Sequence, residues 1–275
     1  MSWWAVDVRP APERRAALGE WLVVRTGQAI EERDDGTLVT FADSEPAANA
    51  LIAEIQSVHQ VSAGARALDP IDWSVRWRDG IESRRFGRLT VSPSWLASAA
   101  HDRLTVIIDP ETAFGSGEHG STRAALTLLE RRVSAGDRVL DLGSGSGILA
   151  IAAVRLGAER AIGIETDAES NVVASRNAEI NGVDRATSFV EGDAAVMAPL
   201  LGPAELLLSN ILRTVNTLLI PSITAALRPG GVAIFSGMES AEAPLFRPVL
   251  ETAGYTALDE IEDAGWWAIA VRRRG

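Results

Sequence analysis

The sequence predicts an α/β protein in which a largely parallel, doubly wound sheet is preceded by a small α+β domain. From about residue 100 to the end, short apolar runs of strand character alternate with longer runs of helix character. This alternation favours parallel strands with helices on both faces of the sheet. The first 60 residues instead follow the order strand, helix, strand, strand, helix, which is typical of a ferredoxin-like domain.

The elements of the N-terminal domain follow from periodicity and turn chemistry. Residues 3–8 alternate as a strand does, and residues 12–25 place their apolar side chains as an amphipathic helix does. Residues 34–36, Asp-Asp-Gly, separate two strand-like runs and predict a hairpin. Residues 45–58 repeat the helical pattern. We therefore expect a separate domain over residues 1–62.

The next segment, residues 63–99, shows no clear period, and we expect a connector with a few short strands. Three tryptophans and five arginines lie between Asp69 and Trp95, a composition that also occurs in nucleic-acid-binding patches. Four acidic residues interleave with these arginines, however, and carboxylates repel a phosphate backbone. We therefore expect no direct contact with nucleic acid from this segment.

Residues 100–275 are expected to form the second, larger domain. Its strand-like runs ahead of the C-terminus are residues 104–108, 138–142, 161–164, 188–191, 205–209 and 232–235. The helix-like runs that alternate with them are residues 121–132, 148–156, 168–180, 216–227 and 244–253. Two last strand-like runs, residues 255–261 and 266–271, follow each other without a helix. We expect these two to pair as an antiparallel hairpin at the edge of the sheet.

Composition and charge exclude several classes of protein. The 275 residues include no cysteine, which excludes disulfides, thiolate metal sites and cysteine nucleophiles. No apolar run approaches the roughly 20 residues that span a bilayer, and the N-terminus lacks the pattern of a signal peptide, so we expect a cytoplasmic protein that binds no membrane. The net charge is −11, and arginine supplies all 26 basic residues. This charge disfavours nucleic acid and favours a basic protein as partner.

The strongest functional signal is the segment 141–148, Asp-Leu-Gly-Ser-Gly-Ser-Gly-Ile, between a predicted strand and a predicted helix. Glycines such as Gly143 and Gly145 let the backbone turn sharply and approach a ligand closely. Their spacing differs from the Gly-x-Gly-x-x-Gly of dinucleotide-binding folds. Asp141 is placed to meet a cation or an amino group, such as the aminoacyl end of S-adenosylmethionine. A tight turn without a ligand is the alternative interpretation.

The carboxyl ends of the next two strands carry acidic residues at the edge where open α/β sheets bind ligands. Glu165 follows the strand 161–164, and its carboxylate can accept hydrogen bonds from both hydroxyls of a ribose. Thr166 and Glu169 form the sequence pattern of a capping box, which leaves Glu165 available for a ligand. Asp193 is either a contact to the adenine amino group or only a turn residue.

Asn210 follows the buried strand 205–209 at the same edge of the sheet. Its amide offers one acceptor and two donors, enough to hold an amine in line with a sulfonium methyl group; the alternative is a hydrogen bond to its own backbone. The segment 109–123 contains flexible glycines before a helix, so it predicts a loop that closes over a ligand. His119 in this loop is either a base or a packing residue.

Together these segments resemble the PrmA family, methyltransferases that modify the large-subunit ribosomal protein L11. The resemblance covers most of residues 70–275 and rests on residues 114–122, 141–150, 162–165, 209–212 and 227–231. It implies a Rossmann-like, seven-stranded domain that uses S-adenosylmethionine. The family's cofactor contacts correspond to Thr122, Gly143, Glu165 and Asn210. We expect four further residues beside the same cofactor, namely Phe114, Asp141, Gly145 and Asp193.

The chain departs from the family's pattern at a few positions. Glu165 stands where the family commonly has Asp, and Ser144 where it often has Cys. The family's frequent Thr-Gly-Thr-His is Ser-Gly-Glu-His here, with Glu118 as the changed acid, and the N-terminal domain is short. The first two changes keep the chemistry of the cofactor site, whereas the last two concern the recognition of the substrate.

The resemblance implies N-methylation of lysine side chains, of the N-terminal amine, or of both, in ribosomal protein L11. Asn210 is the expected catalytic residue, and residues 1–62 are the expected substrate-recognition domain. We find no His–Asp pair that would act as a dedicated base. The alternatives are a methyltransferase acting on a small molecule or on another protein's lysine, and a dinucleotide-dependent oxidoreductase or non-catalytic ligand-binding fold.

Overall fold

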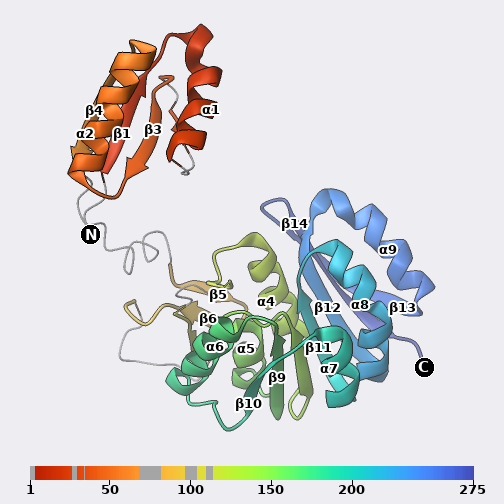
Figure 1. Ribbon diagram of the computed structural model, residues 1–275. Coiled ribbons are helices and arrows are strands. Elements are labelled where there is room, and N and C mark those ends of the chain that lie inside the picture. The colour runs from red at the N-terminus through yellow and green to blue at the C-terminus, as the bar shows by residue number, and fades with distance from the viewer. Residues whose placement is uncertain (1–3, 27–29, 34, 68–81, 97–103, 110–113) are drawn as a thin grey trace. The chain divides into compact units, whose positions relative to one another are not determined.

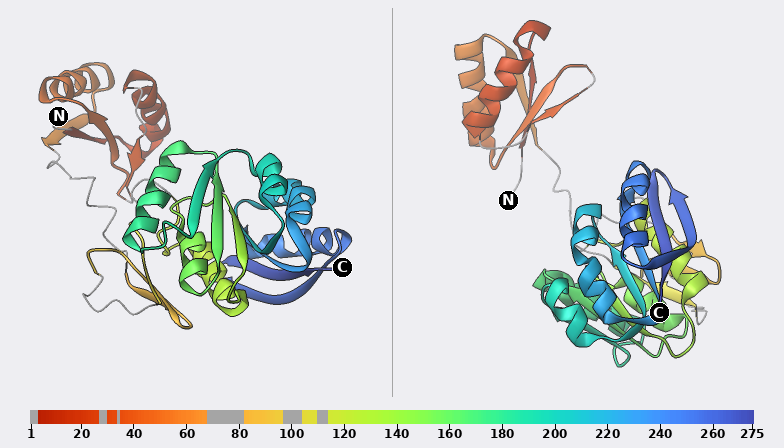
Figure 2. Two further views of the ribbon diagram at one scale, coloured as in Figure 1. Left: turned by 90° about the horizontal axis from the view of Figure 1, so that it is seen from below. Right: turned by 90° about the vertical axis from the view of Figure 1, so that its right-hand side faces the viewer.

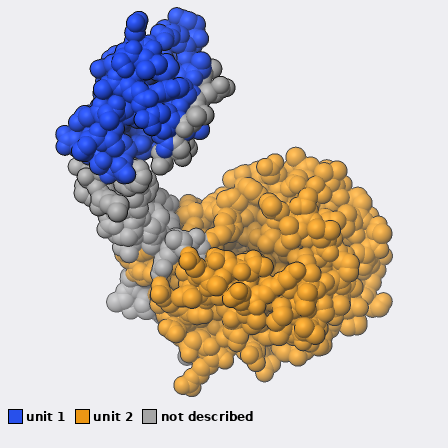
Figure 3. Space-filling model, in the orientation of Figure 1, with its two compact units in different colours: residues 1–76 blue, residues 77–275 orange. Residues whose placement is uncertain are grey.

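The computed structural model of the protein describes residues 4–26, 30–33, 35–67, 82–96, 104–109 and 114–275. The chain forms two compact units, residues 1–76 and residues 77–275, which are coloured separately in Figure 3. Much of the expected connector, residues 68–81 and 97–103, lies outside the described residues.

The N-terminal unit contains a four-stranded antiparallel sheet and two helices. In chain order its elements are β1 (Trp4–Arg9), the turn η1 (Pro12–Arg14), α1 (Arg15–Thr26), β2 (Glu31–Glu32), β3 (Leu38–Ala42), α2 (Glu45–Glu54), the π-helical turn η2 (Ile55–His59) and β4 (Ser62–Ala67). The strands lie in the order β2-β3-β1-β4 (Figure 1). The elements before β4 follow the expected order strand, helix, strand, strand, helix, whereas β4, which completes the βαββαβ arrangement, lies almost entirely in the segment expected to be a connector.

The core of this unit lies between its sheet and its helices. Val6 of β1, Leu22 of α1 and Ile55 are fully buried in one apolar cluster. Ser44 begins α2, because its Oγ accepts a hydrogen bond from the Ala47 N–H at 3.4 Å. Burial of these apolar side chains is the main favourable contribution to the stability of the unit.

The larger unit is built on a seven-stranded sheet. After α4 (Gly120–Arg132), its elements are β8 (Arg138–Leu142), α5 (Ile148–Arg155), β9 (Arg160–Glu165), α6 (Ala168–Ile180), β10 (Thr187–Glu191), α7 (Ala194–Leu201), β11 (Ala204–Asn210), α8 (Arg213–Ala226), β12 (Leu227–Glu239), the turn η3 (Ser240–Glu242), α9 (Ala243–Thr252), β13 (Tyr255–Asp263) and β14 (Trp266–Arg273). The strand order is β10-β9-β8-β11-β12-β14-β13. β14 alone runs opposite to the other six strands of this sheet. It pairs with β13, so the expected antiparallel hairpin at the sheet edge is confirmed.

Helices cover both faces of this sheet, as Figures 1 and 2 show. Apolar residues of α4, α5 and α6 form one core layer, and those of α7, α8 and α9 form the other. Leu206 and Leu208 of β11 belong to the first layer, whereas Leu207 between them belongs to the second. This alternation is the period of two that a strand buried on both faces requires.

One expected strand of this unit belongs to another sheet, and one helix of the unit was not expected. The run 104–108 is not a strand of the main sheet: β7 (Thr105–Ile107) pairs with β6 (Leu89–Ser92), which pairs with β5 (Arg84–Phe86), in a separate three-stranded sheet. The helix α7 was not expected, because Pro199 interrupts it and apolar residues lie on most of its sides.

Two buried asparagines, Asn177 on α6 and Asn181 directly after this helix, form hydrogen bonds to the segment around β7 and to the glycine loop, residues 143–147. Asn181 Oδ1 accepts a hydrogen bond from the Ile107 N–H at 2.8 Å, and its Nδ2 donates to the Ile107 carbonyl oxygen at 2.6 Å. Asn177 Oδ1 accepts from the Asp109 N–H at 3.1 Å, and its Nδ2 donates to the Ser146 carbonyl oxygen at 2.9 Å. These side chains therefore satisfy buried backbone groups on two separate segments.

Replacement of Asn181 by Leu should lower the free energy of unfolding by about 1–3 kcal/mol, because the Ile107 N–H and carbonyl lose their partner. Urea denaturation followed by tryptophan fluorescence measures this change. Ser175→Ala on the exposed side of the same helix is the matched control, and it should change stability by less than about 0.5 kcal/mol. An Asn181→Leu protein as stable as the wild type would contradict this role.

Candidate active site

The glycine loop between β8 and α5 is in close contact with two other segments. Gly143, Gly145 and Gly147 have φ angles of 69°, 50° and 79°, a region that favours glycine. A Cβ on Gly143 would lie 2.6 Å from Ile211 Cγ2, and a Cβ on Gly145 would lie 2.5 Å from the Phe114 carbonyl oxygen. The loop therefore packs between the turn that follows β11 and the segment that precedes α4.

Asp141 lies within β8, just before this loop, and is buried. Its Oδ2 accepts a hydrogen bond from the Ala150 N–H at 3.1 Å, and its Oδ1 has no hydrogen-bond partner among the described residues. Burial raises the pKa of Asp141 to about 7, and the negative charge of Glu165 adds to this increase. Asp141 therefore offers a buried acceptor that a cationic ligand would stabilise in its ionised form.

Glu165 ends β9 and is half-buried beside the glycine loop. Its Oε2 accepts a hydrogen bond from the Gly145 N–H at 3.1 Å, and its Oε1 accepts from the Thr166 N–H at 2.7 Å. The expectation that Thr166 caps α6 is wrong, since the cap is Asp167, whose carboxylate accepts from the Ser170 N–H at 3.2 Å. The Glu165 carboxylate is thus fixed by backbone donors: Oε1 also accepts from the Asp167 N–H at 3.1 Å, whereas Oε2 keeps a second lone pair for a ligand.

Asp193 follows β10 and begins α7. Its Oδ1 accepts a hydrogen bond from the Ala195 N–H at 2.8 Å, which is the geometry of a helix N-cap. The side chain is exposed at the same sheet edge as Glu165. The structure thus shows the capping role of Asp193, and a contact to adenine stays a prediction.

Asn210 and Thr122 meet although 88 positions separate them in the sequence. Asn210 Nδ2 lies 3.2 Å from Thr122 Oγ1 and donates to it. Thr122, in the first turn of α4, is fully buried. Asn210 Oδ1 is buried and has no hydrogen-bond partner among the described residues, so it is available to accept a hydrogen bond from a ligand.

Three rings form an aromatic wall in which His119 lies between Phe114 and Trp266. The His119 ring centroid is 5.3 Å from that of Phe114 and 4.3 Å from that of Trp266. Its Nδ1 lies 2.7 Å from Ser121 Oγ. Burial lowers the pKa of His119, and the nearby Arg123 lowers it further, so the imidazole is neutral at physiological pH. Trp266 was missed in the sequence, where it is only part of a hairpin strand.

Ion pairs fix the segment that carries Phe114 and His119. Glu118 accepts from Arg84 Nη2 at 2.5 Å and from the Glu82 N–H at 3.0 Å. Arg123 Nη2 donates to Asp263 Oδ1 at 2.6 Å. The segment is therefore held by β5 on one side and by the end of β13 on the other; its first part, residues 110–113, lies outside the described residues.

The geometry as a whole suits a ligand that carries positive charge and hydrogen-bond donors. Asp141 pairs with Leu208 of the neighbouring strand, two residues before Asn210. The free oxygens of Asp141 and Asn210 thus belong to adjacent strands at one sheet edge, and the glycine loop follows directly. A ligand at this edge would therefore meet two buried acceptors on neighbouring strands.

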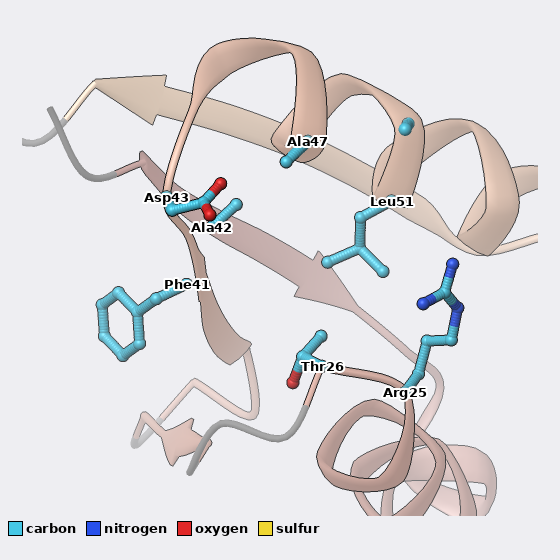
Figure 4. A pocket seen from close by; sticks show the side chains of 8 residues that line it. Arg25, Thr26, Phe41, Ala42, Asp43, Ala47 and Leu51 are labelled. Atoms are coloured by element: carbon cyan, nitrogen blue, oxygen red, sulfur yellow. The ribbon is translucent and has the colours of Figure 1, made fainter. Parts of the chain in front are cut away.

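A second recess lies in the N-terminal unit, between α1, β3 and α2, with a volume of about 400 Å³. Figure 4 shows the Asp43 carboxylate at one end of this recess, the Arg25 side chain at the other and Leu51 in its wall. Arg25 is bound to Glu54, with Nη2 and Oε2 2.9 Å apart. The recess is therefore lined by both polar and apolar side chains, and its Asp43 carboxylate is not part of an ion pair among the described residues.

The described part of the chain lacks two further features. No group of three or more His, Cys, Asp or Glu residues there could hold a metal ion. Within the same residues, no helix is both long enough and apolar enough to cross a membrane.

The chain is similar to several known proteins. The family model described as ribosomal protein L11 methyltransferase (PrmA) matches residues 15–274. A protein of that name from Pelotomaculum thermopropionicum is 37% identical over 225 residues, 81% of this chain and 72% of the relative. Another from Thermus thermophilus is 37% identical over 202 residues, 74% of this chain and 78% of the relative.

Solved structures agree with this likeness. Ribosomal protein L11 methylase from Lactobacillus delbrueckii subsp. bulgaricus superposes with a TM-score of 0.63 and 28% identity, over 70% of this chain and 100% of that chain. Precorrin-6y C5,15-methyltransferase from Geobacter metallireducens superposes with a TM-score of 0.51 and 17% identity, over 62% of this chain and 97% of that chain. The second match shows the fold alone.

The raised pKa of Asp141 predicts a pH dependence of folding. The folded protein keeps the Asp141 proton up to about pH 7, whereas the unfolded chain loses it near the ordinary aspartate pKa of 3.8. The contribution of this group to the free energy of unfolding therefore falls as the pH rises from about 4 to 7, by at most about 1.4 kcal/mol per pH unit.

Asp141→Asn removes this contribution, because an amide does not titrate. The difference in free energy of unfolding, wild type minus variant, should decrease between pH 5 and pH 7 and level off above pH 7.5. Urea titrations of both proteins at each pH measure it. A difference that is constant over this range would show that Asp141 is already ionised in the folded protein.

Proposed function

This chain belongs to the ribosomal protein L11 methyltransferase (PrmA) family, and we propose that it transfers methyl groups from S-adenosylmethionine to amines of ribosomal protein L11. The observation that carries the proposal is the family match over residues 15–274, because this range includes every residue of the candidate site. The geometry of the site supports the same conclusion through the Asp141 and Asn210 oxygens that have no hydrogen-bond partner among the described residues.

The side chains at the sheet edge fit S-adenosylmethionine. Asp141 Oδ1 is a free acceptor for the ammonium of the aminoacyl group, and we assign the backbone of Gly143 and Gly145, which has positive φ angles directly after Asp141, to contact with the ligand. Glu165 lies where its carboxylate can accept from the ribose hydroxyls. When bound, S-adenosylmethionine supplies a methyl group on a positively charged sulfur that an amine can attack.

Phe114 and Asp193 are the other two residues that we assign to the cofactor site. Phe114 is 56% exposed, and its carbonyl oxygen accepts from the Ser146 N–H of the glycine loop at 2.9 Å, so its ring is available to cover the bound cofactor. Asp193 keeps one carboxylate oxygen outside its helix cap, which we assign to the adenine amino group.

Asn210 is the residue that we assign to the transfer step. A lysine amine with a pKa near 10.4 is only about 0.1% neutral near pH 7.4, which costs about 4 kcal/mol. Asn210 Oδ1 can accept from an N–H of this amine and so point the nitrogen lone pair at the methyl group. Thr122 fixes the Asn210 amide, because Asn210 Nδ2 donates to its hydroxyl.

The proton of the amine needs no dedicated base in this scheme. Removal from water and the adjacent positive charge both lower the pKa of the amine, and the proton then passes to water. His119 keeps its neutral ring between Phe114 and Trp266 and lies within hydrogen-bond distance of Ser121. We therefore assign the aromatic wall to the exclusion of water from the approaching amine.

We assign the selection of the substrate to the N-terminal unit. Residues 1–60 carry five arginines against ten acidic residues, a net charge of −5 of the total of −11. An acidic, separately folded module favours the encounter with a basic protein, and salt screens this attraction over about 8 Å at physiological ionic strength.

Because ribosomal proteins are made in the cytoplasm, we expect the enzyme to act there, without direct contact to nucleic acid.

Glu165→Ala should weaken the binding of S-adenosylhomocysteine by about 1.5–3 kcal/mol, the range for charge-assisted hydrogen bonds lost from a partly buried site. Glu165→Asp should be milder, since it shortens the side chain but keeps both acceptors. Isothermal titration calorimetry measures both, with Asp167→Ala, the neighbouring helix cap, as control. Unchanged binding by Glu165→Ala would place the ribose elsewhere.

A chain that begins at residue 77 should keep its affinity for S-adenosylhomocysteine but lose methylation of ribosomal protein L11. The full chain, incubated with labelled S-adenosylmethionine and whole ribosomal proteins, should label the L11 band, and the rate should fall as salt rises. Equal labelling of L11 by the shortened chain would contradict the role of the N-terminal unit. Label on another component only would point to a different substrate.

A further inference from the structure

Asn216, in the first turns of α8, is a buried amide that the cofactor site does not explain. Its side chain is 0% exposed, and a polar group buried in this way is costly unless it is hydrogen-bonded. The surrounding positions on the same helix, such as Leu219 and Ile220, belong to the apolar core. These neighbours predict an apolar side chain at position 216, so the buried amide indicates a specific role.

The Asn216 side chain makes three hydrogen bonds to residues around Asn210. Asn216 Oδ1 accepts from Ser209 Oγ at 2.6 Å. Asn216 Nδ2 donates to the carbonyl oxygens of Ile211 at 2.9 Å and of Ser236 at 3.1 Å. Ser209 and Ile211 are the residues on either side of Asn210, so the amide fixes the chain immediately before and immediately after it.

The same amide is connected to the partner of Asn210. Ser236 pairs with Asn210 on the neighbouring strand, and its Oγ donates to the Ser121 carbonyl oxygen at 2.8 Å. Thr122, which follows Ser121, accepts from Asn210 Nδ2. A closed path of hydrogen bonds and peptide links therefore runs from Asn216 through β12 and α4 back to Asn210.

Little space surrounds this turn, so a small displacement has few ways to relax. A Cβ on Gly237 would lie 2.5–2.7 Å from the backbone atoms of Ile211, and a Cβ on Gly143 would lie 2.6 Å from the Ile211 side chain. These contacts restrain the turn sterically, and the Asn216 hydrogen bonds fix its polar groups, so loss of these bonds would change the position of Asn210.

We propose that Asn216 is a positioning residue for methyl transfer: it holds the turn 209–211 so that Asn210 and Thr122 together orient the attacking amine. The proposal rests on the role assigned to Asn210 under the proposed function. A residue with only a structural role would lower stability and leave the turnover of the folded enzyme unchanged, so the two roles differ in a measurable way.

The test uses full-length variants with graded losses. Asn216→Asp keeps the acceptor for Ser209 but loses both donated hydrogen bonds, whereas Ser209→Ala loses only the bond to Asn216 Oδ1. The matched control is Thr224→Val on the same helix, which removes a hydroxyl bonded to Ile220 and Tyr255, outside the site. Tm, the Kd of S-adenosylhomocysteine and kcat at saturating L11 and S-adenosylmethionine are measured for each.

We expect kcat to fall about 10²-fold for Asn216→Asp, the order of magnitude for a misplaced catalytic group, and by a smaller factor for Ser209→Ala. The Kd should stay within about threefold, and Thr224→Val should keep wild-type kcat at any loss of Tm. The double variant Ser209→Ala, Asn216→Leu removes the Ser209 hydroxyl together with its acceptor but leaves the Ile211 and Ser236 carbonyls without the amide; its kcat should stay low whatever its Tm.

Two results would overturn the proposal. One is a wild-type kcat for Asn216→Asp and Ser209→Ala; the other is recovery of kcat together with Tm in the double variant. If Asn216→Asp fails to fold, Ser209→Ala and the double variant decide. Asn210→Ala serves as the reference: if it methylates L11 at the wild-type rate, the assigned role of Asn210 fails, independently of the result for Asn216.

Discussion

The close approach of backbone segments around Ile211 is the constraint on which the rest of the site depends. Glycines flank this residue on two sides, since a Cβ on Gly143 or on Gly237 would collide with it. The strands β8, β11 and β12 are neighbours in the sheet, so their carboxyl ends open at the same place. Glycine at both positions lets the turn after β11 lie deep between its neighbours, and this depth brings Asn210 to Thr122.

Buried asparagines complete the hydrogen bonding that this arrangement leaves open. Asn177, Asn181 and Asn216 are at most 7% exposed, and each binds backbone groups outside its own helix. A side-chain amide carries both donors and an acceptor, so it can replace a missing strand partner. Because such a group is costly when unsatisfied, each asparagine also disfavours alternative packings of the loops it holds.

The fold and the cofactor edge could be predicted from local pattern, whereas the contacts that assemble the site could not. Gly143, Glu165 and Asn210 each follow or end an apolar run, and parallel strands bring such ends to one edge. A five-residue run such as 104–108, which contains β7, does not reveal which sheet it joins. The roles of Trp266 and Asn216 depend on partners that only the folded chain brings near, and neither residue belongs to a motif.

Asp141 and Asn216 show two different relations between stability and function. Burial raises the pKa of Asp141 to about 7 and leaves one of its oxygens without a partner; Glu165 adds a second negative charge nearby. Each of these conditions disfavours the ionised form of Asp141 in the ligand-free protein and favours the binding of a cation at the sheet edge. The protein is therefore less stable than it could be at the proposed cofactor site. Asn216 is fully bonded within the chain, so the same contacts that stabilise the fold fix the geometry of Asn210. Selection for stability and selection for transfer geometry therefore act in the same direction at position 216 and in opposite directions at position 141.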